Sequence, residues 1–90
     1  MVASTRSILQ NEGLWHAQTL LEEIIAGCRP EVLDQPQKID SDSDWYFRLK
    51  RRADDVLQVE DFEVTVWKSG RWRAASEVTL DRMVFRGGNR

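Results

Sequence analysis

Apolar residues recur every three or four positions between Leu14 and Ala26, as they do on one face of an amphipathic helix. This spacing predicts a helix over 14–26, and Gly27 directly after it is a good stop signal. The preceding segment, 4–10, either adds a helical turn capped by Ser4 or Thr5 or is separated by a break at 11–13.

The second half of the chain changes to the alternating pattern of β-strands. Segment 62–75 predicts a β-hairpin with a three-residue loop that ends at Gly70, the position where glycine adopts a left-handed conformation cheaply. In that register Val66 pairs with Trp72, and one face of the hairpin is apolar. The other face carries Glu63, Thr65, Trp67, Arg71 and Arg73. Trp72 is therefore expected in the core and Trp67 at an exposed contact surface.

Segment 45–59 fits two structures. Read as strand, turn, strand, it points Trp45 and the alternate residues after it inward, with the turn at 52–55. Read as a helix, it is capped by Ser43 or Asp44. The run of three aromatic residues and the turn-like sequence favour the strands.

Segment 78–86 continues this meander as a further strand. Its apolar phase shifts midway, which predicts a bulge at 81–82. A short helix capped by Ser76 is the alternative.

Together these elements predict one α+β domain over residues 1–90, an N-terminal amphipathic helix packed on an antiparallel β-meander of three to five strands. Residues 29–44 form a long connection with a brief extended piece at 31–33, and residues 87–90 form a frayed tail. The expected core comprises Leu14, Leu21, Ile24, Ile25, Phe47, Leu49, Phe62, Val64, Val66, Trp72, Val78 and Leu80, with Cys28 buried near the helix end.

Composition says more about the cellular compartment of the protein than about its function. A single cysteine among 90 residues excludes an intrachain disulfide and suits a reducing compartment. No apolar run reaches membrane-spanning length, and the first residues lack the pattern of a signal peptide. We therefore expect a cytoplasmic protein without membrane association.

Catalytic and metal-binding sets are not evident. His16 and Cys28, twelve residues apart along one helix and its end, are too far apart to form a nucleophilic pair. Asp40, Asp42 and Asp44 have the alternate spacing that begins a calcium loop, but neither the turn glycine nor the closing glutamate follows. The glycines all have turn or cap explanations, and no phosphate loop is present. We expect no enzyme activity, no cofactor and no bound metal.

Charge is distributed unevenly along the chain. Residues 1–44 hold three basic and eight acidic side chains, whereas residues 45–90 hold ten basic and seven acidic ones. Basic side chains near aromatic ones suit either a protein interface or single-stranded nucleic acid. The expected interaction face consists of Tyr46, Trp67, Arg71 and Arg73, and the candidate phosphate contacts are Lys50, Arg51, Arg52 and Lys68.

These observations predict a non-catalytic protein-interaction module that forms a homodimer, or binds another protein, through this aromatic-basic sheet face. A single-stranded nucleic-acid-binding domain is the first alternative, which the neighbouring acidic residues disfavour. A domain that binds a small apolar ligand between helix and sheet, reached from the 29–44 connection, is the second. None of the patterns identifies a known family.

Overall fold

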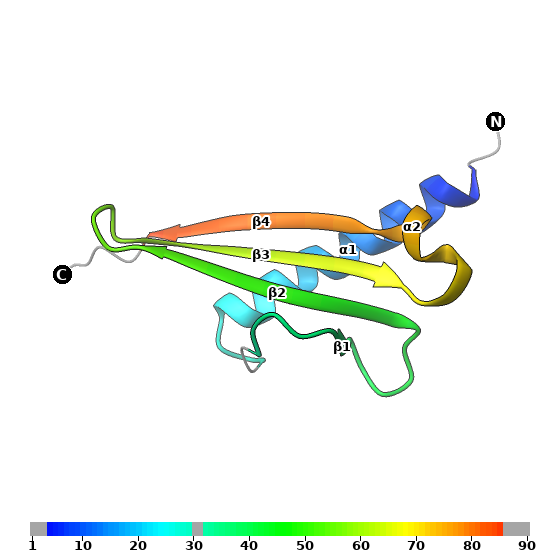
Figure 1. The fold of residues 1–90 in the computed structure, drawn as a ribbon, viewed down its shortest axis with the longest axis horizontal. Coiled ribbons are helices and arrows are strands. Elements are labelled where there is room, and N and C mark those ends of the chain that lie inside the picture. The colour runs from blue at the N-terminus through cyan, green and yellow to red at the C-terminus, as the bar shows by residue number, and fades with distance from the viewer. Residues whose placement is uncertain (1–3, 30–31, 86–90) are drawn as a thin grey trace.

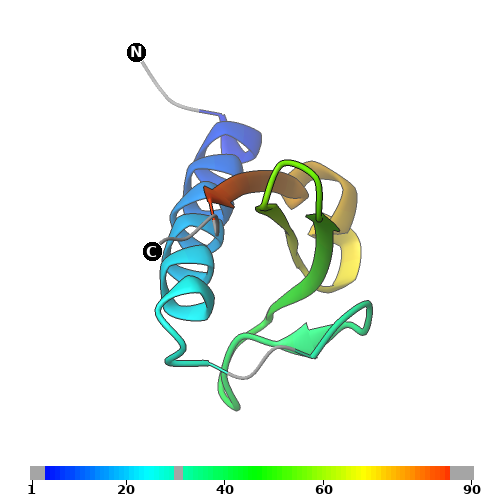
Figure 2. The same cartoon turned by 90° about the vertical axis from the view of Figure 1, so that its left-hand side faces the viewer.

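One long helix packs against one face of a four-stranded antiparallel sheet (Figures 1 and 2). The computed structural model describes residues 4–29 and 32–85. Helix α1 precedes the sheet, whose strand order β1-β2-β3-β4 is also the order along the chain. The elements are α1 (Thr5–Ile25), β1 (Gln37–Lys38), β2 (Trp45–Asp54), β3 (Val59–Lys68), the 3₁₀ turn η1 (Gly70–Trp72), the short helix α2 (Arg73–Ser76) and β4 (Val78–Phe85). The α+β prediction is confirmed.

Helix α1 runs without a break from its cap at Ser4, whose hydroxyl accepts a hydrogen bond from the Ser7 amide at 3.1 Å. The alternative with a break at 11–13 was wrong, because Gly13 serves close packing instead. A Cβ atom there would lie 3.1 Å from the Ser76 carbonyl oxygen and 3.1 Å from a Val78 methyl group, closer than most Cβ contacts, so glycine favours the close approach of α1 to the end of α2 and the start of β4. Gly27 ends the helix at φ 79°, as predicted.

Strands β2 and β3 form a continuous hairpin, which confirms the strand, turn, strand interpretation of segment 45–59. Their pairing runs from Trp45 with Lys68 to Asp54 with Val59. The turn occupies 55–58, three residues later than expected. The Asp54 carboxylate fixes this position, because it accepts hydrogen bonds from the amides of Val56 and Leu57 at 3.0 and 3.1 Å.

The predicted tight hairpin over 62–75 was wrong. Strand β3 pairs with β4 so that Val66 lies opposite Val78, not Trp72, and the residues between form η1 and α2. Gly70 has a positive φ of 81°, but it begins η1 instead of closing a three-residue loop. Trp72 is half-buried and packs against the edge of the core.

Strand β4 confirms the strand interpretation of segment 78–86 over its described residues, but not the bulge. The pairing with β3 is unbroken where Asp81 lies opposite Glu63 and Arg82 opposite Phe62. The apolar phase shift has a different cause. Met83 and Phe85 point to the face that α1 does not cover, where they are 69% and 71% exposed.

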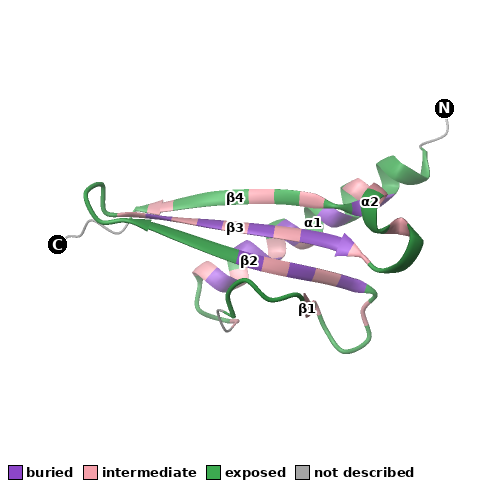
Figure 3. Ribbon diagram, viewed as in Figure 1, coloured by how far each residue is buried: buried purple, intermediate pink, exposed green. Residues whose placement is uncertain are grey.

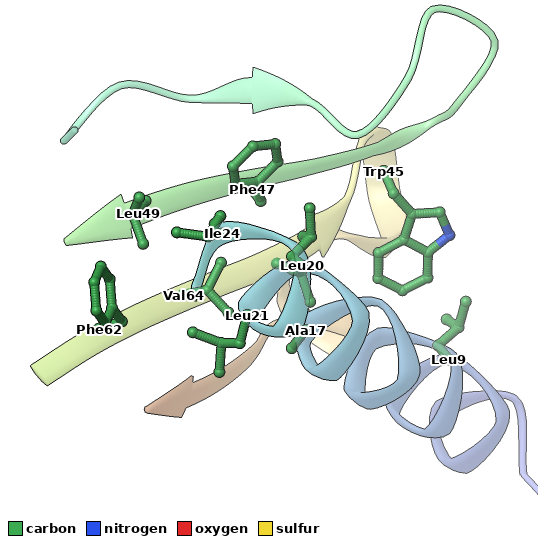
Figure 4. Close-up of a cluster of buried hydrophobic side chains, with 11 residues drawn as sticks. Leu9, Ala17, Leu20, Leu21, Ile24, Trp45, Phe47, Leu49, Phe62 and Val64 are labelled. Carbon is green, nitrogen blue, oxygen red and sulfur yellow. The ribbon is translucent and has the colours of Figure 1, made fainter. Parts of the chain in front are cut away.

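The core lies between α1 and the inner face of the sheet (Figure 4). Its buried members are Leu9, Ala17, Leu20, Leu21, Ile24, Trp45, Phe47, Leu49, Phe62, Val64 and Val66. Two expected members are absent, since Leu14 is 37% exposed and Cys28 is exposed beyond the end of α1. Ile25, Trp72, Val78 and Leu80 are partly buried against this core.

The connection between α1 and β2 passes along the edge of β2. Strand β1 pairs with the first part of β2, and Leu33 forms an isolated bridge with Leu49. This bridge lies within the extended piece expected at 31–33. Residue 31 and the expected frayed tail, 87–90, lie outside the described residues. Of the helices in the described part of the chain, none combines the length and apolar character needed to cross a bilayer.

Candidate functional site

The face of the sheet opposite α1 is not covered by any described helix (Figures 1 and 2). Because side chains alternate along a strand, this face takes every second residue of β2, β3 and β4. We call it the open face. It displays Tyr46, Arg48, Lys50, Arg52 and Asp54 from β2, Val59, Asp61, Glu63, Thr65 and Trp67 from β3, and Thr79, Asp81, Met83 and Phe85 from β4.

Trp67 is the centre of an aromatic-basic cluster at one end of the open face. Tyr46, its direct partner across the strands, stacks on it with ring centroids 6.2 Å apart. The guanidinium carbons of Arg73 and Arg48 lie 4.7 and 5.9 Å from the Trp67 ring centroid. We call these four residues the Trp67 cluster. It unites three of the four residues predicted for the interaction face and adds Arg48, which the sequence interpretation had not included.

Two details of the predicted interaction face were wrong. Trp67 is only 6% exposed, because its neighbours cover the ring that we expected a partner to contact. Arg71 does not join the cluster; its guanidinium lies over Trp72 instead, 4.8 Å from the ring centroid. The accessible part of the cluster is therefore its rim, formed by the half-buried Tyr46 and Arg48 and by the exposed Arg73.

Charges on the rest of the open face are arranged by strand. Arg48, Lys50 and Arg52 form a basic row along β2. Asp61, Glu63 and Asp81 form an acidic row along β3 and β4. The register places Lys50 directly opposite Glu63, which in turn lies opposite Asp81, and places Arg52 opposite Asp61. The open face is thus divided lengthwise into a positive half and a negative half.

The four candidate phosphate contacts do not share one surface. Lys50 and Arg52 lie on the open face, whereas Arg51 points to the opposite side of β2, where its Nε is 3.6 Å from the buried Glu60 carboxylate. Lys68 lies with Asp40, Asp42 and Asp44 around a shallow hollow of about 420 Å³. Strand alternation already separates consecutive residues onto two faces, so the sequence contained this signal.

His16 has a structural setting. The Glu12 carboxylate accepts a hydrogen bond from the Trp45 indole at 3.0 Å and lies 3.7 Å from His16 Nε2. The His16 ring also packs on Trp45, with centroids 5.0 Å apart. Within residues 4–29 and 32–85, no group of three or more His, Cys, Asp or Glu side chains is placed to hold a metal ion.

A second hollow bears on the small-ligand alternative. It has a volume of about 200 Å³ and lies between α1 and the following connection, bounded by Trp15 and Leu20 on one side and by Arg29 and Ile39 on the other. No strand of the sheet contributes to its lining, whereas the ligand site was expected between helix and sheet.

Comparison with known proteins adds no candidate function. No family model, curated protein or solved structure matches this chain. The function is therefore inferred from the geometry of the chain itself.

Proposed function

We propose that this chain is a non-catalytic protein-interaction module that self-associates through the open face of its sheet. The observation that carries the proposal is the one-sidedness of the sheet. Helix α1 buries the apolar part of the inner face, while the open face presents the Trp67 cluster beside two rows of opposite charge. A sheet with one uncovered face is commonly covered by a second layer, and in small domains a second copy can supply it.

The Trp67 cluster suits the end of such an interface. Tyrosine and arginine are enriched among the residues that contribute most to binding at protein interfaces. Stacking on the buried Trp67 ring holds Tyr46, Arg48 and Arg73 in place before a partner arrives, so less side-chain entropy is lost on binding. In this proposal Trp67 supports the contact residues and does not itself make the contact.

A second candidate function follows from the basic row. Arg48, Lys50 and Arg52 lie in line along one strand, beside the Tyr46 ring, as in proteins that neutralise phosphates and stack a base. The acidic row lies directly beside it and would repel a phosphate backbone. Binding of single-stranded nucleic acid is therefore the alternative to be tested, and a second protein copy is the partner that we propose.

The test is light scattering coupled to gel filtration at two protein and two salt concentrations. We expect a concentration-dependent dimer, weakened about two- to fivefold by Arg73→Ala, since a cation–π contact at an exposed site is worth about 0.5–1 kcal/mol. Arg71→Ala is the matched control, because that side chain lies on Trp72 outside the cluster. A wild-type chain that stays monomeric under all conditions would refute self-association, and titration with labelled oligothymidine would then test the nucleic-acid alternative.

A further inference from the structure

The basic row on the open face of one copy can face the acidic row on the open face of a second copy of the same chain. The basic row occupies β2 and the acidic row begins on the neighbouring strand, β3. Lys50 and Glu63 stand at the same height along the strands because they are direct partners in the register, and the same holds for Arg52 and Asp61. A rotation that exchanges β2 and β3 while keeping this height therefore brings opposite charges together.

We propose that two copies pack open face to open face about a two-fold axis that runs parallel to the strands, above the boundary between β2 and β3. This inference rests on the proposed function and names both its partner and its orientation. The rotation lays β2 of each copy over β3 of the other. Lys50 then faces Glu63 of the partner subunit, and Arg52 faces Asp61 of the partner subunit. Tyr46 similarly comes to lie over the Trp67 cluster of the partner subunit.

The other two-fold arrangement of stacked sheets is disfavoured by charge. An axis perpendicular to the strands would lay β2 on β2 and β3 on β3. The basic row would then face a basic row, and the acidic row an acidic one. Like charges placed opposite each other across an interface are strongly unfavourable, so charge selects the parallel axis.

The dimensions of the face predict the strength of this dimer. Stacked sheets lie about 10 Å apart, a distance that lysine and arginine can span toward a carboxylate. The proposed axis overlaps two strands of each copy, β2 and β3, which lie about 4.8 Å apart with ten residues each, so the contact area is about 10 Å wide and about 30 Å long. This area is below that of standard specific interfaces and falls in the range of weak, transient contacts. We therefore expect a reversible dimer of about micromolar affinity that weakens as salt is added.

A charge-swap experiment tests the orientation. Two variants, Lys50→Glu and Glu63→Lys, are measured alone, mixed with each other and mixed with wild type by fluorescence-detected sedimentation. The exposed Cys28, at the end of α1, takes the fluorophore. Because the two-fold axis repeats every contact, we expect each variant alone to self-associate at least about tenfold more weakly than wild type. The equimolar mixture of the two variants should regain an affinity within about threefold of wild type, since both contacts again join opposite charges.

The mixture with wild type separates the two axes. In a mixed dimer about the parallel axis, the carboxylate introduced by Lys50→Glu faces Glu63 of the wild-type chain. This mixed dimer is therefore weaker than the wild-type dimer. About the perpendicular axis the new carboxylate would face the basic row of the wild-type chain, and the mixed dimer would be tighter. A tighter mixed dimer therefore overturns the proposed orientation. A wild-type dimer that neither variant weakens overturns the inference but leaves self-association standing, whereas a monomeric wild type refutes the proposed function itself.

Controls exclude effects of net charge and of folding. Arg82→Glu, exposed on the other face of β4, changes the net charge as Lys50→Glu does, and Glu22→Lys on the exposed side of α1 matches Glu63→Lys. Both controls should dimerise like wild type. Each test variant also places like charges opposite each other within its own sheet, so its melting temperature is measured first. If either fails to fold, Lys50→Gln and Glu63→Gln replace them; each alone should weaken the dimer, and their mixture should recover only part of the affinity, because the mixed dimer keeps one of the two Lys50–Glu63 contacts.

Discussion

Trp67 lies on the open face and yet is buried, because the side chains around it form a cover. Tyr46 stacks beside it, and the guanidinium groups of Arg48 and Arg73 lie within 6 Å of its ring centroid. Trp72 is half-buried at the edge of the core, with Arg71 over its ring. The roles expected from strand alternation, a core Trp72 and an exposed Trp67, are therefore largely exchanged.

The exchanged roles predict which tryptophan supports the fold more. Trp67→Ala should lower the free energy of unfolding by about 3–5 kcal/mol, the usual cost of truncating a buried aromatic residue. Trp72→Ala should cost about half as much, because part of that ring is in water already. Urea denaturation followed by circular dichroism measures both without relying on the tryptophan signal. Trp67→Phe, which keeps an aromatic ring under the two arginines, is the control and should recover most of the loss. A greater loss for Trp72→Ala would contradict this assignment.

At the level of single residues, the sequence predicts the side of a strand or helix on which a residue lies better than the contacts that the residue makes there. Alternation correctly turned Phe47 and Leu49 toward α1, and it placed Tyr46 and Trp67 together on the other side. It could not assign Arg48 to Trp67, because that contact depends on how β2 is aligned with β3. Such alignment is a property of two segments, and no single segment contains it.

At the level of elements, the connection between β3 and β4 shows how a local pattern can mislead. Apolar and basic residues alternate through 71–74 as they would in a strand, yet this stretch forms η1 and the start of α2. The Ser76 hydroxyl accepts the Lys68 amide at 2.8 Å and lies 3.2 Å from the Arg73 carbonyl oxygen, to which it donates. This bridge joins the end of β3 to the end of α2. After this bridge, Val78 lies opposite Val66 and continues the apolar side of the sheet in β4.

Ser76 should accordingly be important for folding although it is small. Its side chain is fully buried, and Ser76→Ala would leave the Lys68 amide without its partner in a partly buried position. We expect a loss of about 1–3 kcal/mol in the free energy of unfolding. Faster hydrogen exchange at the Lys68 amide should accompany it. Ser69→Ala is the matched control, because Ser69 makes no side-chain capping bond, and it should change stability by less than about 0.5 kcal/mol. Equal effects of the two substitutions would mean that the Ser76 bridge does not hold this connection.

At the level of the whole molecule, α1 covers only part of the sheet. The turn between β2 and β3 and the end of β4 project past the helix, and their residues are coloured as largely exposed (Figures 1 and 3). Val56 and Leu57 in this turn are 90% and 62% exposed, and Met83 and Phe85 on β4 are exposed to a similar degree. The projecting end of the sheet is thus held by strand pairing with little apolar burial, while the other end is held by both.

This difference predicts a gradient of local stability along the strands. Amides that are hydrogen-bonded between β2 and β3 should exchange at least about tenfold faster within residues 51–54 and 59–61 than within residues 47–49 and 64–66, because opening the projecting end exposes little apolar surface. Native-state hydrogen exchange, measured by mass spectrometry at a protein concentration low enough to keep the chain monomeric, tests this expectation. A second measurement at high concentration is the control, since a dimer formed through the open face would slow exchange at both ends. Uniform protection along both strands in the monomer would contradict the gradient. It would mean that the sheet opens only as one unit, so that burial under α1 stabilises the uncovered end as strongly as the covered one.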